Sequence, residues 1–146
     1  MENLENIKGN FVLPTSFEHE MGEIERVAQT FAKGDSERFI RQFLEVIQNS
    51  QLTDLIDADW SRLENTDSWD IGVGDLDSVE DHSKHIGRDW ELLKTKLEKG
   101  GQVDAPIIIK IGGVLHLTSG NTRLMVARAL GIRPKVVIVD MTEAVK

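Results

Sequence analysis

Apolar residues at helical spacing form two stripes in the first third of the chain. Thr15 and Glu18 match a capping box, and the stripe that follows them predicts a helix that stops at Gly34. Its apolar members are Met21, Ile24, Val27, Ala28 and Phe31. Asp35 and Ser36 are suitable caps for a second helix. The stripe of that helix consists of Phe39, Ile40, Phe43, Leu44 and Ile47.

The pattern becomes less regular after the second stripe. A third, shorter helix is predicted from the apolar residues Leu52, Leu55, Ile56, Trp60 and Leu63. Glycines and aspartates then predict a short strand near Trp69–Val73, followed by a mobile acidic loop that reaches Asp81. A further helix over residues 83–99 is indicated by Ile86, Trp90, Leu93 and Leu97.

The pattern is clearest from Pro106 onward. The apolar run 107–111, a Gly-Gly turn and the run 114–118 predict a β-hairpin. A helix over 122–130 ends at a glycine, and the β-branched run 135–139 predicts a strand. We therefore expect one mixed sheet that contains the hairpin and strand 135–139 and is packed by helix 83–99.

This element order predicts an α+β fold in two parts. Residues 1–64 are expected to form an N-terminal helical extension, and residues 65–146 the domain with the mixed sheet. If stripes 21–31 and 39–47 are more apolar than that domain can cover, they belong to an oligomer interface. A homodimer is the oligomer we expect.

Composition narrows the function classes. A chain of 146 residues supports one main core. The formal charge of −8 makes direct nucleic-acid binding unfavourable, because DNA-binding proteins usually neutralise phosphates with clustered Lys and Arg. The chain has no cysteine, which excludes disulfides, thiolate metal sites and cysteine nucleophiles. No apolar stretch reaches 18 residues, so we expect a cytoplasmic protein without a membrane partner.

The segment between the hairpin and the helix is the best candidate for chemistry. It consists of Ser119, Gly120, Asn121, Thr122 and Arg123. The N–H groups at a helix start, two hydroxyls and a guanidinium together suit a phosphate group. The alternative is an ordinary helix cap, formed by Ser119 or Asn121, with Arg123 paired to a nearby acid.

The same residues resemble the ParB/sulfiredoxin superfamily. The resemblance covers approximately Trp69 to Asp140, and its specific part is Pro106–Gly131, with Gly120 to Arg123 matching the family's Gly-x-x-Arg turn. It implies a small mixed sheet with packed helices and a turn that binds nucleotide phosphates. Compact members with extra N-terminal helices are similar to proteins of large bacteriophages, which would place this chain in the host cytoplasm.

Two departures from known members limit what the resemblance implies. Sulfiredoxins carry a cysteine where this chain has Asn121, so reduction through a thiol is excluded. The chain ends shortly after strand 135–139, which leaves no helix-turn-helix of the kind that partition proteins use. Other members are small-molecule kinases and nucleotide hydrolases, which imply a nucleotide of the ATP or CTP type, Mg²⁺ and a carboxylate base.

Acidic residues before the hairpin supply candidates for that base. We select Asp67, Glu80 and Asp81 as the catalytic candidates. Other acids remain open: Asp70, Asp75, Asp77 and Asp104. For each of them the alternative is a solvated surface carboxylate.

Several other side chains are candidates for ligand contact. Arg88 and His116 are assigned to the cofactor site, the alternatives being an ion pair for Arg88 and an exposed strand position for His116. His82 and His85 lie three residues apart and could hold a metal with Asp81. Base stacking is considered for the three tryptophans, with Trp90 assigned to the core and Trp69 kept open. The third tryptophan is Trp60.

The leading hypothesis is a protein that binds a nucleotide or a phosphorylated small molecule. Its reaction would be phosphoryl transfer or nucleotide hydrolysis, with the turn Gly120–Arg123 as the phosphate cradle. One alternative is a non-catalytic module that senses a nucleotide or docks a protein partner. A further alternative is a nuclease-like accessory in DNA processing, which the acidic charge disfavours.

Overall fold

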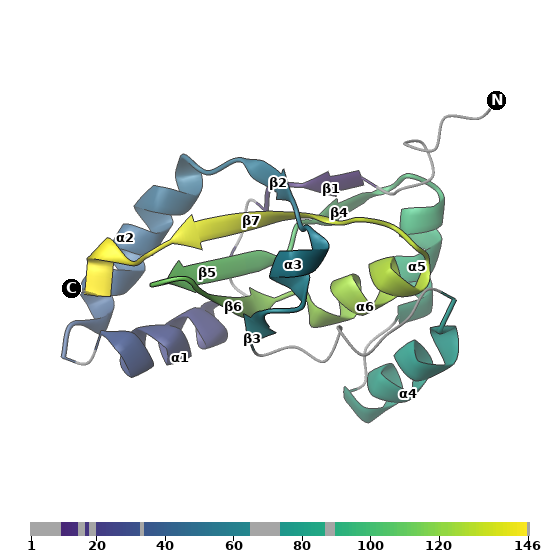
Figure 1. The fold of residues 1–146 in the computed structure, drawn as a ribbon, viewed down its shortest axis with the longest axis horizontal. Helices are drawn as coiled ribbons and strands as arrows, with labels where there is room; N and C mark the ends of the chain where they lie inside the picture. The colour runs from purple at the N-terminus through teal and green to yellow at the C-terminus, as the bar shows by residue number, and fades with distance from the viewer. Residues whose placement is uncertain are drawn as a thin grey trace.

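A five-stranded mixed sheet forms the centre of the molecule (Figure 1). The computed structural model describes residues 10–14, 17, 20–32, 34–64, 74–86 and 90–145. The strands follow the order β2 (Leu52–Asp54), β7 (Lys135–Asp140), β5 (Ile107–Ile111), β6 (Val114–Ser119) and β3 (Leu63–Glu64). With the helices described below, this confirms the predicted α+β class.

The C-terminal half of the sheet agrees with the sequence pattern. Strands β5 and β6 form an antiparallel hairpin, and both glycines of its turn have positive φ angles. Helix α6 (Asn121–Ala129) connects β6 to β7, which pairs in parallel with β5. The predicted hairpin, helix and final strand, and their place in one sheet, are therefore confirmed.

Alternate residues of the strands face two different apolar layers. Ile107 and Ile109 lie in one core together with Val137 and Val139. Ile108, on the other face of β5, packs in a second core with Leu55, Trp60, Leu63, Leu115, Leu117, Leu124 and Val136. The continuous apolar run of β5 thus reflects a strand that is buried on both faces.

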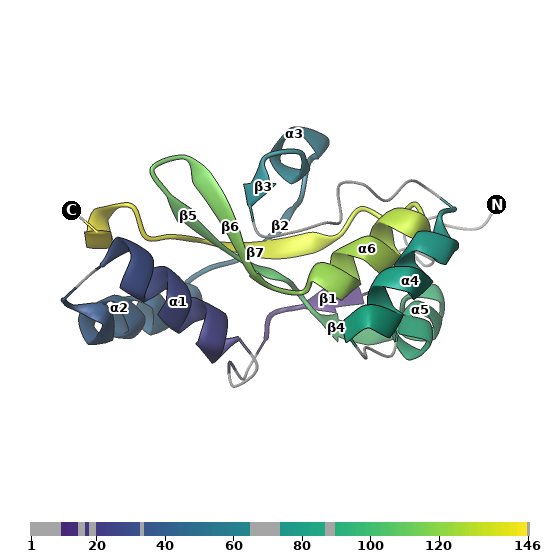
Figure 2. The same ribbon diagram turned by 90° about the horizontal axis from the view of Figure 1, so that it is seen from below.

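Two N-terminal helices, α1 (Met21–Phe31) and α2 (Ser36–Gln48), lie together below the sheet (Figure 2). Their stripes are buried in the first core through Ile24, Val27, Ala28, Phe39, Phe43 and Ile47. The sheet of the same chain therefore covers the apolar faces from which we expected a homodimer. Light scattering remains the measurement that decides the oligomeric state.

The third helix expected between residues 52 and 63 is wrong. This segment forms two short strands, β2 and β3, on either side of the single-turn helix α3 (Asp57–Trp60). Antiparallel pairing of β2 with β7 fixes the first strand, and an ion pair of 3.0 Å between Lys135 and Asp54 supports its register. Both edge strands of the sheet come from before residue 65, so the expected boundary at residue 64 does not separate two cores.

The expected acidic loop is helical from residue 76 onward. Helix α4 (Leu76–Ile86) begins where the Oδ1 atom of Asp75 accepts a hydrogen bond of 3.2 Å from the Ser78 N–H. Helix α5 (Trp90–Glu98) follows it, so the single helix predicted over 83–99 is in fact two. Both pack against α6 beside the end of the sheet and not across it (Figure 2). The predicted strand Trp69–Val73 lies outside the described residues.

A second, two-stranded sheet was not predicted. Strand β1 (Asn10–Val12) pairs in parallel with β4 (Gln102–Asp104), and Phe11 and Val103 are buried at the same register position. Strand β4 leads through Ala105 and Pro106 directly into β5, so the N-terminal segment is attached at the entrance to the hairpin. The 3-10 turn η3 (Glu143–Val145) follows β7.

The burial of α2 predicts that residues 1–64 unfold together with the sheet. Replacing Phe43, which has no exposed surface, by alanine should lower the free energy of unfolding by about 3–5 kcal/mol. The matched control is Val46→Ala on the same helix, which removes a side chain at an exposed position and should change the stability by no more than about 0.5 kcal/mol.

Urea denaturation followed by circular dichroism and by tryptophan fluorescence measures both variants. We expect one cooperative transition that shifts in the Phe43→Ala variant for both probes. Two separate transitions, of which only one responds to this substitution, would contradict a shared core.

Candidate functional site: the turn before helix α6

Gly120 is the residue on which the turn is built. Its φ angle of 96° lies in the left-handed region, and it occupies the N-cap position of α6. A Cβ atom at this position would lie 2.8 Å from the Cβ atom of Pro106. Glycine is therefore required both by the backbone angle and by the contact with proline. The sequence suggested that a phosphate could approach the backbone closely at Gly120. On the side of Gly120 where a Cβ atom would lie, Pro106 already occupies this space.

The helix that starts at this turn presents its positive end there. The first intrahelical hydrogen bond, 2.9 Å long, runs from the Leu124 N–H to the Gly120 carbonyl. The N–H groups before Leu124 have no acceptor within the helix, as in any α-helix. Gly120 has no side chain with which to cap them. The expected alternative was a cap by Ser119 or Asn121, whose side chains lie outside those that the structure describes, with Arg123 paired to an acid, and Arg123 does lie beside Glu20. The N-terminus of α6 keeps the positive partial charge of a helix start, which favours an anion.

Arg123 lies in the first turn of α6 and is held by two groups. Its Nη1 atom donates a hydrogen bond to the backbone carbonyl of Asp104, at the end of β4. Its Nη2 atom lies 3.9 Å from the Oε1 atom of Glu20, and only 18% of the Arg123 side chain is exposed. The guanidinium therefore has a defined position beside the N-terminus of the helix.

Glu20 is a part of this site that sequence reasoning missed. It precedes α1, and its carbonyl accepts a hydrogen bond of 3.0 Å from the Ile24 N–H. Its side chain is 7% exposed, and its Oε2 atom is buried without a hydrogen-bond partner. The spacing of Glu20, Ile24 and Val27 shows that this acid continues the buried stripe of α1. A charged residue at a stripe position was the signal that could have identified it.

Among the expected acids that the structure describes, Asp104 contacts this turn through Arg123. Its side chain is exposed, while its carbonyl binds Arg123. The Gly74 N–H donates a hydrogen bond of 2.6 Å to the Ala129 carbonyl, so α4 begins at the far end of α6. A helix of nine residues is about 13 Å long, which separates Asp75 and its neighbour Asp77 from the turn by that distance.

The remaining candidates are distributed over other parts of the fold. Glu80 and Asp81 lie on α4 and not in a loop, and His82 and His85 are on the same helix. Thr122 is half-buried in the first turn of α6, between Asn121 and Arg123. Ser119 is the last residue of β6. The candidates Asp67, Asp70, Trp69 and Arg88 lie outside the described residues.

The other two tryptophans have structural positions. Trp60 is 3% exposed in the second core, and the guanidinium carbon of Arg128 lies 4.1 Å from its ring centroid. Trp90 is partly buried against the first core. Neither ring is therefore placed to stack an exposed base. Within the part of the chain that the structure describes, no three His, Asp or Glu side chains gather in a way that could hold a metal ion.

His116 faces α1 and not the turn. Its ring lies 5.0 Å from that of Phe31, its Nε2 atom is buried without a hydrogen-bond partner, and the residue is half-buried. Gly120 follows His116 by four residue steps along the strand, a distance of about 13 Å. Burial lowers the pKa of His116 below its ordinary value of 6.5; the Glu64 carboxylate opposes this shift, and the Arg26 guanidinium adds to it.

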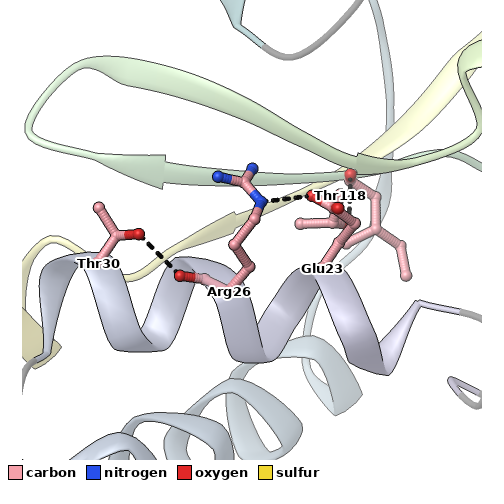
Figure 3. Close-up of polar contacts among 5 residues, drawn as sticks. Glu23, Arg26, Thr30 and Thr118 are labelled. Atoms are coloured by element: carbon pink, nitrogen blue, oxygen red, sulfur yellow. Dashed lines mark hydrogen bonds and ion pairs between the residues drawn. The ribbon is translucent and has the colours of Figure 1, made fainter.

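Polar side chains of α1 lie near this part of the sheet (Figure 3). Arg26 pairs with Glu23 at 2.9 Å, and the Thr30 hydroxyl donates a hydrogen bond of 2.8 Å to the Arg26 carbonyl. From β6, the buried Thr118 hydroxyl donates to the Ile107 carbonyl at 2.9 Å. The first two contacts lie within α1 and the third lies within the hairpin.

Comparison of the chain with protein-family models, with curated proteins and with solved structures found no match. The resemblance to the ParB/sulfiredoxin superfamily therefore stays a prediction. Among the described residues, no helix has the length and the apolar character needed to cross a membrane.

The contact between Gly120 and Pro106 predicts a difference between two glycines with the same backbone angle. Gly113 also has a φ of 96°, but a Cβ atom there would meet nothing within 4 Å. Gly113→Ala should cost about 1–2 kcal/mol of stability because of the left-handed angle alone. Gly120→Ala should cost about 1–3 kcal/mol more, because the methyl group overlaps Pro106. Equal losses in chemical denaturation would show that the contact with proline is not tight.

The burial of His116 predicts a pH dependence of stability. Since the pKa of the folded state is lowered, the unfolded state binds more protons below about pH 6.5. The free energy of unfolding should therefore be fully retained above that pH and fall as the pH decreases toward the folded-state pKa. Urea titrations from pH 7.5 to 5 should show a shallower decline in His116→Gln than in the parent. In Glu64→Gln the decline should be steeper, because that carboxylate raises the pKa. Identical declines in all three proteins would contradict this explanation.

Proposed function

We propose that the protein binds a phosphate-bearing small molecule, specifically a nucleotide of the ATP or CTP type, at the first turn of α6. The observation that carries this proposal is the position of Arg123. Its guanidinium is anchored by the Asp104 carbonyl, and the residue itself belongs to the first turn of the helix. A fixed cation beside a helix N-terminus is a combination that favours phosphate oxygens.

The affinity expected for a phosphate group follows from the contributions of Arg123 and of the helix N-terminus. A hydrogen bond to a charged group contributes about 1.5–3 kcal/mol, and the helix N-terminus about 0.3–1 kcal/mol. Their sum corresponds to dissociation constants near or above the millimolar range for phosphate alone. A nucleotide must therefore gain further affinity from its sugar, its base or Mg²⁺.

Phosphoryl transfer or nucleotide hydrolysis is the reaction class that we propose for this site. Both reactions need a carboxylate near the phosphate, and the Glu20 carboxylate lies 3.9 Å from the Arg123 guanidinium, whereas Asp104 contacts Arg123 through its backbone carbonyl. Glu80 and Asp81 remain candidates on α4. The resemblance to superfamily kinases and hydrolases supports the same reaction class, with Mg²⁺ supplied together with the nucleotide.

A non-catalytic nucleotide sensor is the second candidate function. Glu20 immediately precedes α1, and its carboxylate lies within 3.9 Å of the Arg123 guanidinium. A ligand that draws Arg123 toward its phosphate would weaken this contact and so act on the start of α1. That coupling favours a sensor if nucleotide binding is found without any product.

The test of the proposed function begins with a nucleotide screen. Thermal stabilisation and product formation are measured with ATP, CTP and inorganic phosphate, each with and without Mg²⁺. Stabilisation with product supports an enzyme, and stabilisation without product supports the sensor. No stabilisation by any of these ligands would contradict the proposed function.

Arg123 variants then locate the site. Arg123→Ala should weaken binding of the best nucleotide by about 1.5–3 kcal/mol, measured by calorimetric titration. Arg123→Lys should restore part of the affinity, because lysine keeps the charge but not the planar fork. The control is Arg133→Ala, an exposed arginine beyond the other end of α6, which should bind like the parent. If Arg123→Ala is folded and binds as tightly as the parent, the cradle is elsewhere.

A further inference from the structure

Glu20 carries a buried oxygen atom that the fold leaves without a hydrogen bond. Four described side chains have such atoms, namely Glu20, Gln42, His116 and Arg128, and Glu20 is the carboxylate among them. Burying a carboxylate oxygen without a donor is costly, so an unsatisfied one calls for an explanation such as a functional role. The ion pair with Arg123 does not remove this cost, because its 3.9 Å distance involves the other oxygen, Oε1, and is beyond hydrogen-bond distance, while Oε2 has no hydrogen-bond partner.

The surroundings of Glu20 connect this unsatisfied oxygen to the α6 turn. The residue occupies the N-cap position of α1, and Arg123 belongs to the first turn of α6. The Glu20 carboxylate therefore belongs to the N-terminus of α1 and lies beside the guanidinium of a residue from the first turn of α6. Such an environment is electropositive, so it accommodates a second anion.

We infer that Glu20 accepts a hydrogen bond from the ligand of the α6 turn, and that this ligand is a phosphate ester with hydroxyl donors on its sugar. This inference rests on the proposed function. An ionised carboxylate only accepts hydrogen bonds, so its partner has to be a donor and not a second phosphate oxygen. The Arg123 guanidinium, next to both groups, reduces the repulsion between the phosphate and the carboxylate.

Such a site should distinguish ribonucleotides from analogues that lack the sugar hydroxyls. A ribonucleotide offers its phosphate to the α6 turn and its ribose hydroxyls to Glu20, whereas an analogue without these hydroxyls leaves the Oε2 atom unsatisfied. A site with a buried acceptor rejects a ligand that lacks the matching donor. Because Oε2 is buried in the free protein, the side chain of Glu20 or Arg123 must change its rotamer when the ligand enters.

The experiment compares pairs of ligands that differ only in their hydroxyls. ATP and CTP and their 2′,3′-dideoxy analogues are titrated calorimetrically into the parent and into Glu20→Met. Methionine has a similar length but no strong acceptor, and it removes a poorly satisfied buried charge, so the variant should stay folded. Glu20→Gln provides a second variant of closely similar shape. The control is Glu23→Met, one turn along α1, where the carboxylate is 40% exposed.

The parent should bind the ribonucleotides about tenfold more tightly than the dideoxy analogues. This ratio should fall to about twofold or less in Glu20→Met, take an intermediate value in Glu20→Gln, and stay unchanged in Glu23→Met. Equal binding of both ligand types by the parent, or an unchanged ratio in a folded Glu20 variant, would overturn the inference while leaving the proposed function in place. If neither ligand type nor inorganic phosphate binds the parent, the proposed function fails and the inference fails with it.

Discussion

The contact between Gly120 and Pro106 is the constraint on which the arrangement of the C-terminal half depends. Pro106 precedes β5, and its carbonyl accepts a hydrogen bond of 2.9 Å from the Val137 N–H of β7. Gly120 follows β6 and begins α6 with a left-handed backbone. The contact therefore joins the residue before β5 to the residue after β6, beside the pairing of β5 with β7. It also determines where the N-terminus of α6 lies relative to the sheet.

A second set of contacts connects this turn with the beginning of the chain. Arg123 binds the carbonyl of Asp104, where β4 ends, and lies beside Glu20, where α1 begins. Helix α1 in turn packs its apolar stripe into the first core. The turn is thus in contact with groups from two distant parts of the sequence. A binding event at Arg123 has a direct physical route to the N-terminal helices through the Glu20 carboxylate.

A helix or strand could be predicted from the sequence when its own residues show an apolar period or a glycine boundary. The hairpin, α6 and β7 have clear apolar periods and glycine boundaries, and the structure reproduces them. Strands β2 and β3 contain three and two residues, too few for a period, and they exist because they pair with β7 and β6. Helix α4 was mistaken for a loop because its aspartates were treated as surface charges. In fact Asp75 is its capping residue.

The same distinction applies to the site. The turn from Gly120 to Arg123 is local and was identified from its residues. The partners of Arg123 depend on tertiary contacts, so neither Glu20 nor the carbonyl of Asp104 could be assigned to it from sequence. The contact of Pro106 with Gly120 could not be predicted either, because it forms only when the residue before β5 packs against the residue after β6. His116 was assigned to the ligand site by alternation, but the helix that covers that face of the hairpin is α1.

The most direct test of the account is to locate nucleotide binding by backbone amide chemical shifts. Uniformly ¹⁵N-labelled protein is titrated with the nucleotide that stabilises it most. We expect the largest changes at the amides that begin α6, residues 121–124, together with Glu20 and Met21 at the start of α1. Saturable changes centred on another surface, with the amides of 121–124 and of Glu20 unaffected, would contradict the assignment of this turn as the phosphate site.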